Sequence, residues 1–143
     1  MNFKIKNLLV ILTVIFLFSN CSKYSRNNEY NILDFGAVND STILSTKAIQ
    51  NAINTASKNG GGKIIFPQGV YLTGTIVLQN NVSLFLTEGS RIKGSEKHED
   101  YLYHRTKINI YPDPDRANLI YGDNLKNISI EGKGVIDGNG TKF

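Results

Sequence analysis

The chain has 143 residues, of which 41% are hydrophobic and 20% are charged, and its formal net charge is +4. This length provides for a single domain, and the apolar fraction is too high for a disordered chain. The single cysteine excludes a disulfide framework and any cysteine-rich zinc or iron–sulfur site. Beyond residue 20, 14 basic residues stand against 12 acidic ones, so we expect no nucleic-acid partner.

Residues 1–20 have the pattern of an export signal. Lys4 and Lys6 precede an apolar stretch over residues 8–18, which is shorter than the roughly 20 residues that cross a bilayer and matches the core of a secretory signal. The sequence Phe-Ser-Asn-Cys, ending at Cys21, resembles the lipobox of exported lipoproteins. We therefore expect lipidation of Cys21 and anchoring to the outer membrane or cell surface. The alternative is a plain cleaved signal and a periplasmic or extracellular protein.

Residues 21–29 are polar and lack periodicity, which predicts a tether ahead of a domain over residues 30–143. Alternation predicts a short strand over residues 30–35, stopped by glycine. A helix is predicted over residues 46–58, with Ser45 or Thr46 as its N-cap and a run of glycines at its end. Its apolar stripe consists of Ile49, Ala52, Ile53 and Ala56.

After residue 62 the sequence repeats with a period near twenty. Residues 63–66 match residues 83–86, residues 66–74 match residues 86–94, and residues 127–130 repeat the pattern of residues 81–84. A constant offset of this kind is typical of a coil that stacks on itself, because one turn cannot bury its own apolar face. We therefore predict an all-β solenoid, a right-handed parallel β-helix whose N-terminal end is capped by the helix.

Several segments together resemble a known family of such proteins. They are residues 31–37, 48–53, 60–71, 78–86 and 127–140. The last segment contains the most specific feature, the Gly-Lys-Gly-Val-Ile-Asp-Gly-Asn-Gly stretch over residues 132–140. The first three are similar to the N-terminal portion of pectin-lyase-like proteins, and the last two are similar to glycoside hydrolase family 28, which contains the polygalacturonases. The resemblance covers residues 30–143.

This resemblance implies inverting hydrolysis of α-1,4-galacturonan or a related pectic polysaccharide, without a cofactor and by a monomer when full length. The family's catalytic motifs (Asn-Thr-Asp, Asp-Asp, Gly-His-Gly and Arg-x-Lys) do not occur in the 143 residues. We therefore expect the chain to be the N-terminal portion of an enzyme, inactive by itself, with its catalytic residues beyond Phe143. The alternatives are a non-catalytic carbohydrate-binding or adhesin β-helix and a pectate-lyase-type enzyme.

The insertion over residues 96–116 interrupts the repeat and is the candidate substrate-binding segment. Long insertions leave a coil as loops on one face, where cations can pair with galacturonate carboxylates and tyrosines can stack on sugar rings. The candidates are Tyr101, Tyr103, Arg105, Lys107, Tyr111 and Arg116. We expect no metal site at His98, Glu99, Asp100 and His104, because their spacing is not that of regular ligands. Asp137 precedes glycine and is predicted to lie in a turn.

Overall fold

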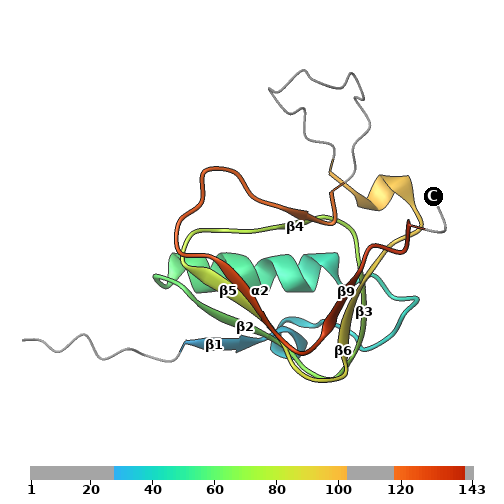
Figure 1. The fold of residues 1–143 in the computed structure, drawn as a ribbon, viewed down its shortest axis with the longest axis horizontal. Coiled ribbons are helices and arrows are strands. Elements are labelled where there is room, and N and C mark those ends of the chain that lie inside the picture. Colours follow the sequence, from blue (N-terminus) through green and yellow to red (C-terminus); the bar gives the residue numbers. More distant parts are fainter. Residues whose placement is uncertain (1–27, 103–117, 141–143) are drawn as a thin grey trace, which may run out of the picture.

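The computed structural model describes residues 28–102 and 118–140, and in it the chain passes repeatedly through three parallel sheets (Figure 1). The described chain begins with β1 (Glu29–Asn31), the 3-10 helix η1 (Ile32–Phe35) and α2 (Thr46–Lys58). The first pass through all three sheets then contains β2 (Gly62–Phe66), β3 (Gly69–Thr73) and β4 (Ile76–Val77). The later passes contain β5 (Val82–Leu86), β6 (Ser90–Gly94), η2 (His98–Asp100), β7 (Ile120–Tyr121), β8 (Ser129–Gly132) and β9 (Val135–Asp137).

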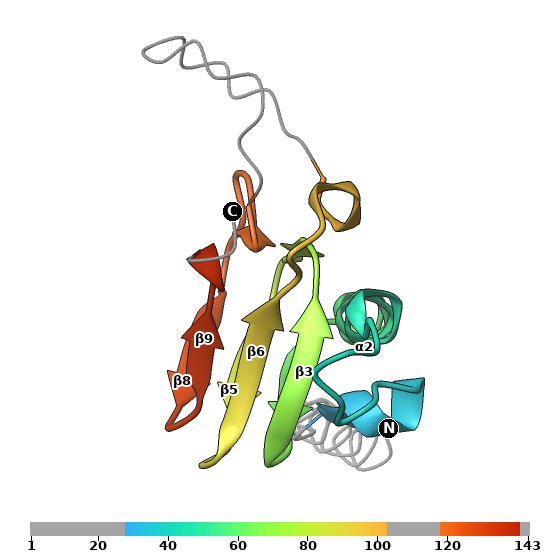
Figure 2. The same cartoon turned by 90° about the vertical axis from the view of Figure 1, so that its right-hand side faces the viewer.

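Each sheet collects the same strand from successive passes. Their orders are β1-β2-β5-β8, β3-β6-β9 and β4-β7, and every pairing is parallel. Seen from the side of the stack, α2 lies next to β3 at one end, and β8 and β9 lie at the other end (Figure 2). The predicted stack of parallel strands with a helix at its N-terminal end is confirmed.

The helix α2 has the bounds that its apolar stripe predicts. Its stripe, together with Ala48, is buried. The prediction that Ser45 or Thr46 caps the helix is correct for position only. Ser45 occupies the N-cap position, but its side chain makes no capping hydrogen bond. Its hydroxyl instead accepts the Val38 N–H at 3.0 Å, and Thr46 Oγ1 accepts the Gly74 N–H at 2.8 Å. Ser45 thus ties the start of the helix to the loop before it, and Thr46 ties it to the residue after β3.

The predicted strand over residues 30–35 is wrong beyond Asn31. The side chain of Asn31 accepts the Leu33 N–H at 3.0 Å, and this local hydrogen bond turns the chain into η1, as asparagine side chains do in Asx turns. Gly36, at a φ of 90°, ends the 3-10 helix in the left-handed conformation. Ile32 is fully buried within η1.

The core is a set of inward apolar side chains that stack from pass to pass. Ile64 pairs with Leu84, and Leu84 pairs with Ile130, at the offsets that the sequence repeat predicts. Ile64 and Leu84 are fully buried. At the β8 and β9 end of the stack the apolar side chains are partly exposed: Ile128, Ile130, Val135 and Ile136 are between 42% and 46% exposed.

The repeat between β3 and β6 has an offset of 21 residues, and the predicted offset of 20 is wrong there. Tyr71 pairs with Ile92, whereas an offset of 20 would place Leu72 beside Ile92. The cause is the turn that precedes each strand, because two residues separate β2 from β3 and three separate β5 from β6. The shift brings two fully buried side chains, Tyr71 and Ile92, onto the same inward row.

One corner of the coil uses backbone with positive φ in every pass. Gly61, Asn81 and Asn127 have φ angles of 120°, 62° and 55°, a conformation that glycine adopts freely and asparagine tolerates. A Cβ on Gly61 would meet the carbonyl oxygen of Asn81. The side-chain amides of the two asparagines stack, with Asn127 Nδ2 donating to Asn81 Oδ1 at 2.8 Å.

Two buried tyrosines differ in what their hydroxyls contact, and this difference can be measured. Tyr71 is fully buried, and its hydroxyl has no hydrogen-bond partner among the described residues; burial raises its pKa. The Tyr101 hydroxyl donates to the Ser95 carbonyl at 2.7 Å.

We expect Tyr71→Phe to leave the free energy of unfolding unchanged or raise it by up to about 1 kcal/mol, and Tyr101→Phe to lower it by about 1 kcal/mol. Chemical denaturation of the full-length protein measures both values. A larger loss for Tyr71→Phe than for Tyr101→Phe would contradict these assignments.

Candidate functional site

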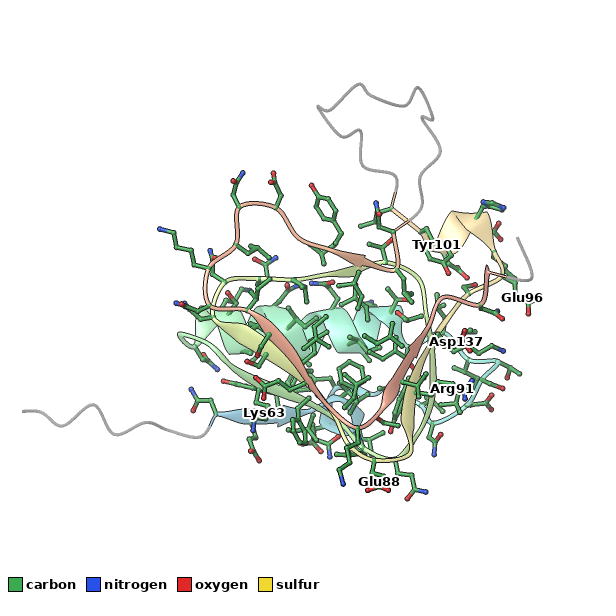
Figure 3. All side chains as sticks on the ribbon, in the orientation of Figure 1. Lys63, Glu88, Arg91, Glu96, Tyr101 and Asp137 are labelled. Carbon is green, nitrogen blue, oxygen red and sulfur yellow. The ribbon has the colours of Figure 1, made fainter. Side chains whose placement is uncertain are left out.

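The strands β3, β6 and β9 present charged side chains on their outward face. Tyr71 and Ile92 point into the core, so the alternation of a strand turns the residues beside them outward. Lys93 pairs with Leu72 on one side and Asp137 on the other, and Arg91 lies two residues earlier on β6. We call Leu72, Arg91, Lys93 and Asp137 the outer sheet face; Figure 3 labels Arg91 and Asp137 on it.

Asp137 is held in its ionised form. Its Oδ1 accepts the Asn139 N–H at 2.9 Å, and its Oδ2 lies 3.1 Å from the Arg91 guanidinium. The Asn139 hydrogen bond, Arg91 and the nearby charge of Lys93 together lower the pKa of Asp137, against a smaller opposing effect of burial. Asp137 is the last residue of β9, so the prediction that it lies in a turn is wrong by one position; its hydrogen bond with Asn139 forms an Asx turn that begins directly after the strand. A carboxylate with a lowered pKa is poorly suited to donate a proton as a general acid.

A polar pocket of about 310 Å³ opens at the end of the outer sheet face. We call it the polar pocket; it is lined by Ser41, Thr42, Leu72, Lys93, Ser95, Glu96 and Lys97. Three segments build it: the loop before α2, the outward side of β3 and β6, and the residues that follow β6. Its lining offers two ammonium groups, one carboxylate and three hydroxyls, which is the chemistry that binds a polar, negatively charged molecule.

A network of hydrogen bonds fixes the wall of the polar pocket that follows β6. The Ser95 hydroxyl donates to Asp100 Oδ2, and Ser95 Oγ accepts the Lys97 N–H at 3.1 Å. The Tyr101 hydroxyl donates to the Ser95 carbonyl. A Cβ on Gly74 would meet the carbonyl oxygen of Asp100, so this wall packs directly on the first pass.

The hydroxyl of Thr75 joins the two ends of the predicted insertion. Thr75 is 2% exposed; its Oγ1 accepts the Leu102 N–H at 2.8 Å and donates to the Asn118 carbonyl at 2.7 Å. From there the Ile76 N–H donates to the Leu119 carbonyl at 2.8 Å, which begins the pairing of β4 with β7. One buried side chain therefore sets where the chain leaves and rejoins the coil.

A second hollow, of about 380 Å³, lies beside the N-terminal half of α2. Its lining consists of Leu44, Thr46, Lys47, Gln50, Asn51, Thr75, Val77, Asp100 and Leu102. Gln50 spans it with two hydrogen bonds of 2.9 Å to the backbone of Val77. Leu44 and Leu102 are 44% and 52% exposed at its rim.

Of the six predicted substrate-binding residues, Tyr101 is described. It is 6% exposed, so its ring offers little surface for stacking on a sugar in this arrangement, and its contact with substrate stays a prediction. The others lie outside the described residues: Tyr103, Arg105, Lys107, Tyr111 and Arg116. Arg91, Lys93 and Lys97 are not among the six residues predicted from the sequence. The alternation of charged and apolar residues in β6 was the signal that could have identified the first two.

Within residues 28–102 and 118–140, no group of three or more histidine, cysteine or acidic side chains could hold a metal ion. In the same residues no helix has the length and apolar character needed to cross a membrane. Cys21 and the signal segment lie outside the described residues.

Comparisons with known proteins agree with this architecture. A family model described as rhamnogalacturonase A/epimerase, pectate lyase-like, matches residues 30–141. The exo-poly-α-D-galacturonosidase of Dickeya chrysanthemi is 39% identical over 121 residues, which is 78% of this chain and 20% of that enzyme. The structure of the family 28 exopolygalacturonase of Yersinia enterocolitica is 34% identical with a TM-score of 0.66, and the match covers 78% of this chain and 21% of that one.

A relative with a different description is also similar. The plasmin and fibronectin-binding protein A of Streptococcus pneumoniae is 34% identical over 120 residues, which is 82% of this chain and 16% of that protein. The chain thus spans about a fifth of the length of these relatives. The predicted resemblance to glycoside hydrolase family 28 is confirmed.

The pKa of Asp137 provides a test of the site's electrostatics. We expect the carboxyl of Asp137 to titrate below 3.8 in the folded protein. Its contribution to stability is therefore present above the unfolded pKa and is lost as the pH falls through the folded value. In Arg91→Met the pKa should rise, because the guanidinium that favours the ionised carboxyl is removed. Carbon-13 NMR of the side-chain carboxyl follows both titrations. An unchanged pKa in Arg91→Met would contradict the ion pair.

Proposed function

Because the chain belongs to the rhamnogalacturonase A/epimerase, pectate lyase-like family, we propose that the protein is a polygalacturonase-like glycoside hydrolase. Its proposed substrate is α-1,4-galacturonan or a related pectic polysaccharide. The similarity that carries this proposal is the 39% identity to the exo-poly-α-D-galacturonosidase over 121 residues. The stacked parallel strands and the likeness to the family 28 exopolygalacturonase support a right-handed parallel β-helix as the scaffold.

The proposed reaction is inverting hydrolysis of the glycosidic bond. It requires one carboxylic acid that protonates the leaving oxygen and one carboxylate that activates water on the opposite face of the sugar, about 6.5–9.5 Å away. Asp40 and Asp137 are unsuited to the first role, because hydrogen bonds to Thr42 and Asn139 lower their pKa values. Neither of these two carboxylates therefore serves as the acid in this proposal.

The outer sheet face supplies groups that suit an anionic polymer. Lys93 projects from β6 beside Arg91, which is paired with Asp137, and Lys97 follows at the polar pocket. A pectic chain carries one carboxylate on each galacturonate unit, and arginine and lysine bind carboxylates through charge-assisted hydrogen bonds. We place the substrate along this face, across the parallel strands.

A non-catalytic adhesin is the second candidate function. It is supported by the 34% identity to the plasmin and fibronectin-binding protein A, which extends over 82% of this chain. A shared scaffold does not decide function, since the same fold carries different sites. A pectate-lyase-type enzyme is the third candidate, and it differs from a hydrolase in its product.

The product distinguishes these candidates. We expect the full-length protein to release reducing ends from polygalacturonate without a rise in ultraviolet absorbance, because hydrolysis adds water across the bond and leaves no double bond. A reducing-sugar assay run beside an absorbance trace measures both. An ultraviolet-absorbing product would establish a lyase instead. Release of neither product, together with binding of the full-length protein to plasmin or fibronectin, would favour the adhesin.

We also propose that the protein is exported and anchored by lipid at Cys21. The support is the order of residues 1–21: two lysines, a short apolar stretch and the lipobox-like sequence that ends in the chain's single cysteine. The polar residues 22–29 would then join the anchor to the folded domain. An exported enzyme of this kind meets pectic polymers outside the inner membrane.

Replacement of Cys21 tests the anchor. Wild-type protein should sediment with membranes, whereas Cys21→Ala should appear in the soluble fraction or retain its uncleaved signal. Several acyl chains on one cysteine give firm attachment, while a single chain binds only marginally. Fractionation followed by mass spectrometry of the N-terminal peptide measures the outcome, with Ser19→Ala as a neighbouring control. Unchanged sedimentation and an unmodified cysteine would reject the proposal.

A further inference from the structure

We propose that the polar pocket is a subsite for one uronate unit of an acidic polysaccharide, with the sugar carboxylate between Lys93 and Lys97. This inference rests on the proposed function and adds to it a location and two specificity-determining side chains. Lys93 reaches the pocket from the outward side of β6, while Lys97 reaches it from the segment that follows β6. The two lysines therefore come from separate pieces of backbone and converge on one hollow.

The charge in the pocket is available to a ligand. Salt bridges among the described residues join Arg91 to Asp137 and Lys133 to Glu88, so neither pocket lysine takes part in one. Asp137, the carboxylate beside Lys93 in the sheet, is already paired with Arg91. The acidic group within the lining is Glu96, which accepts a long hydrogen bond of 3.4 Å from Asn139 Nδ2. Two ammonium groups against one carboxylate favour an anion.

The remaining lining distinguishes an acidic sugar from a bare inorganic anion. Ser41 and Thr42 present hydroxyls from the loop before α2, and Glu96 presents an acceptor. These groups can bind the hydroxyls of a sugar ring, which both donate and accept hydrogen bonds. Leu72 adds an apolar patch for the C–H face of the ring. A volume of about 310 Å³ lies at the lower end of the range of ligand pockets.

The pocket wall is fixed before any ligand arrives. Ser95 is 2% exposed, and its hydrogen bonds to Asp100, Tyr101 and the Lys97 backbone hold that backbone in place. On the opposite wall, the Asp40 carboxylate accepts both the backbone N–H and the hydroxyl of Thr42 at 2.7 Å. Walls that need no rearrangement lose less conformational entropy on binding, which favours recognition of a small ligand.

The test is the binding of trigalacturonate to the full-length protein, measured by isothermal titration calorimetry at low salt. Lys93→Met and Lys97→Met should each weaken binding by about two- to fivefold, and the double variant by roughly the product, as expected for exposed ion pairs. Lys133→Met removes the same charge from the turn between β8 and β9 and should leave the affinity unchanged. Methyl-esterified trigalacturonate should bind wild type and the double variant equally.

Two results would overturn the subsite. One is an unchanged affinity for trigalacturonate in the double variant while its melting temperature matches wild type. The other is a loss of affinity for the methyl ester, in the double variant, that equals its loss of affinity for trigalacturonate. This would show that the lysines do not recognise the carboxylate. The proposed function is judged separately by the release of reducing ends. Lysine-dependent binding without hydrolysis would therefore support the subsite and contradict the proposed hydrolase. Hydrolysis with binding that does not depend on the lysines would support the hydrolase and contradict the subsite.

Discussion

The structure depends on a single constraint: each pass of the chain buries its inward side chains only against the passes on either side. Ile64, Leu84 and Ile130 form one such row across β2, β5 and β8. A slip of one residue between two passes would turn the whole inward set outward, because side chains alternate along a strand. The register is therefore held at a corner as well, where Gly61, Asn81 and Asn127 repeat the same positive φ.

The same constraint explains what the sequence could predict. Inward rows have to be apolar, so the match of residues 63–66 to residues 83–86 is visible in the sequence and agrees with the pairing of β2 with β5. The stripe of α2 is visible for the same reason. Turn lengths carry no such signal. The extra residue in the turn before β6 shifted the pairing of β3 with β6 by one position, which only the alternation of buried residues reveals.

The candidate site was harder to predict, because outward residues are not restricted by packing. Arg91 and Lys93 stand on either side of the buried Ile92, and nothing in a list of charged residues separates them from other surface charges. The folded structure distinguishes them by their position: β6 lies between β3 and β9, and Lys97, which follows β6, lines the same pocket as Lys93. Tyr101 illustrates the opposite case: a tyrosine in a polar segment resembles a binding residue in sequence, yet its hydroxyl secures Ser95 and its ring is buried.

The register across the predicted insertion is the central claim, because the positions of β8 and β9 on the stack depend on it. Ser83 and Ser129 are partners in the parallel pair of β5 and β8, and their hydroxyl oxygens are 2.7 Å apart. Neighbouring parallel strands have a spacing that a disulfide can bridge. In a Cys21→Ser background, Ser83→Cys with Ser129→Cys should oxidise to a disulfide, detected by mass spectrometry of the linked peptides, whereas Ser83→Cys with Glu131→Cys should not. A linkage in the second pair and none in the first would contradict the register.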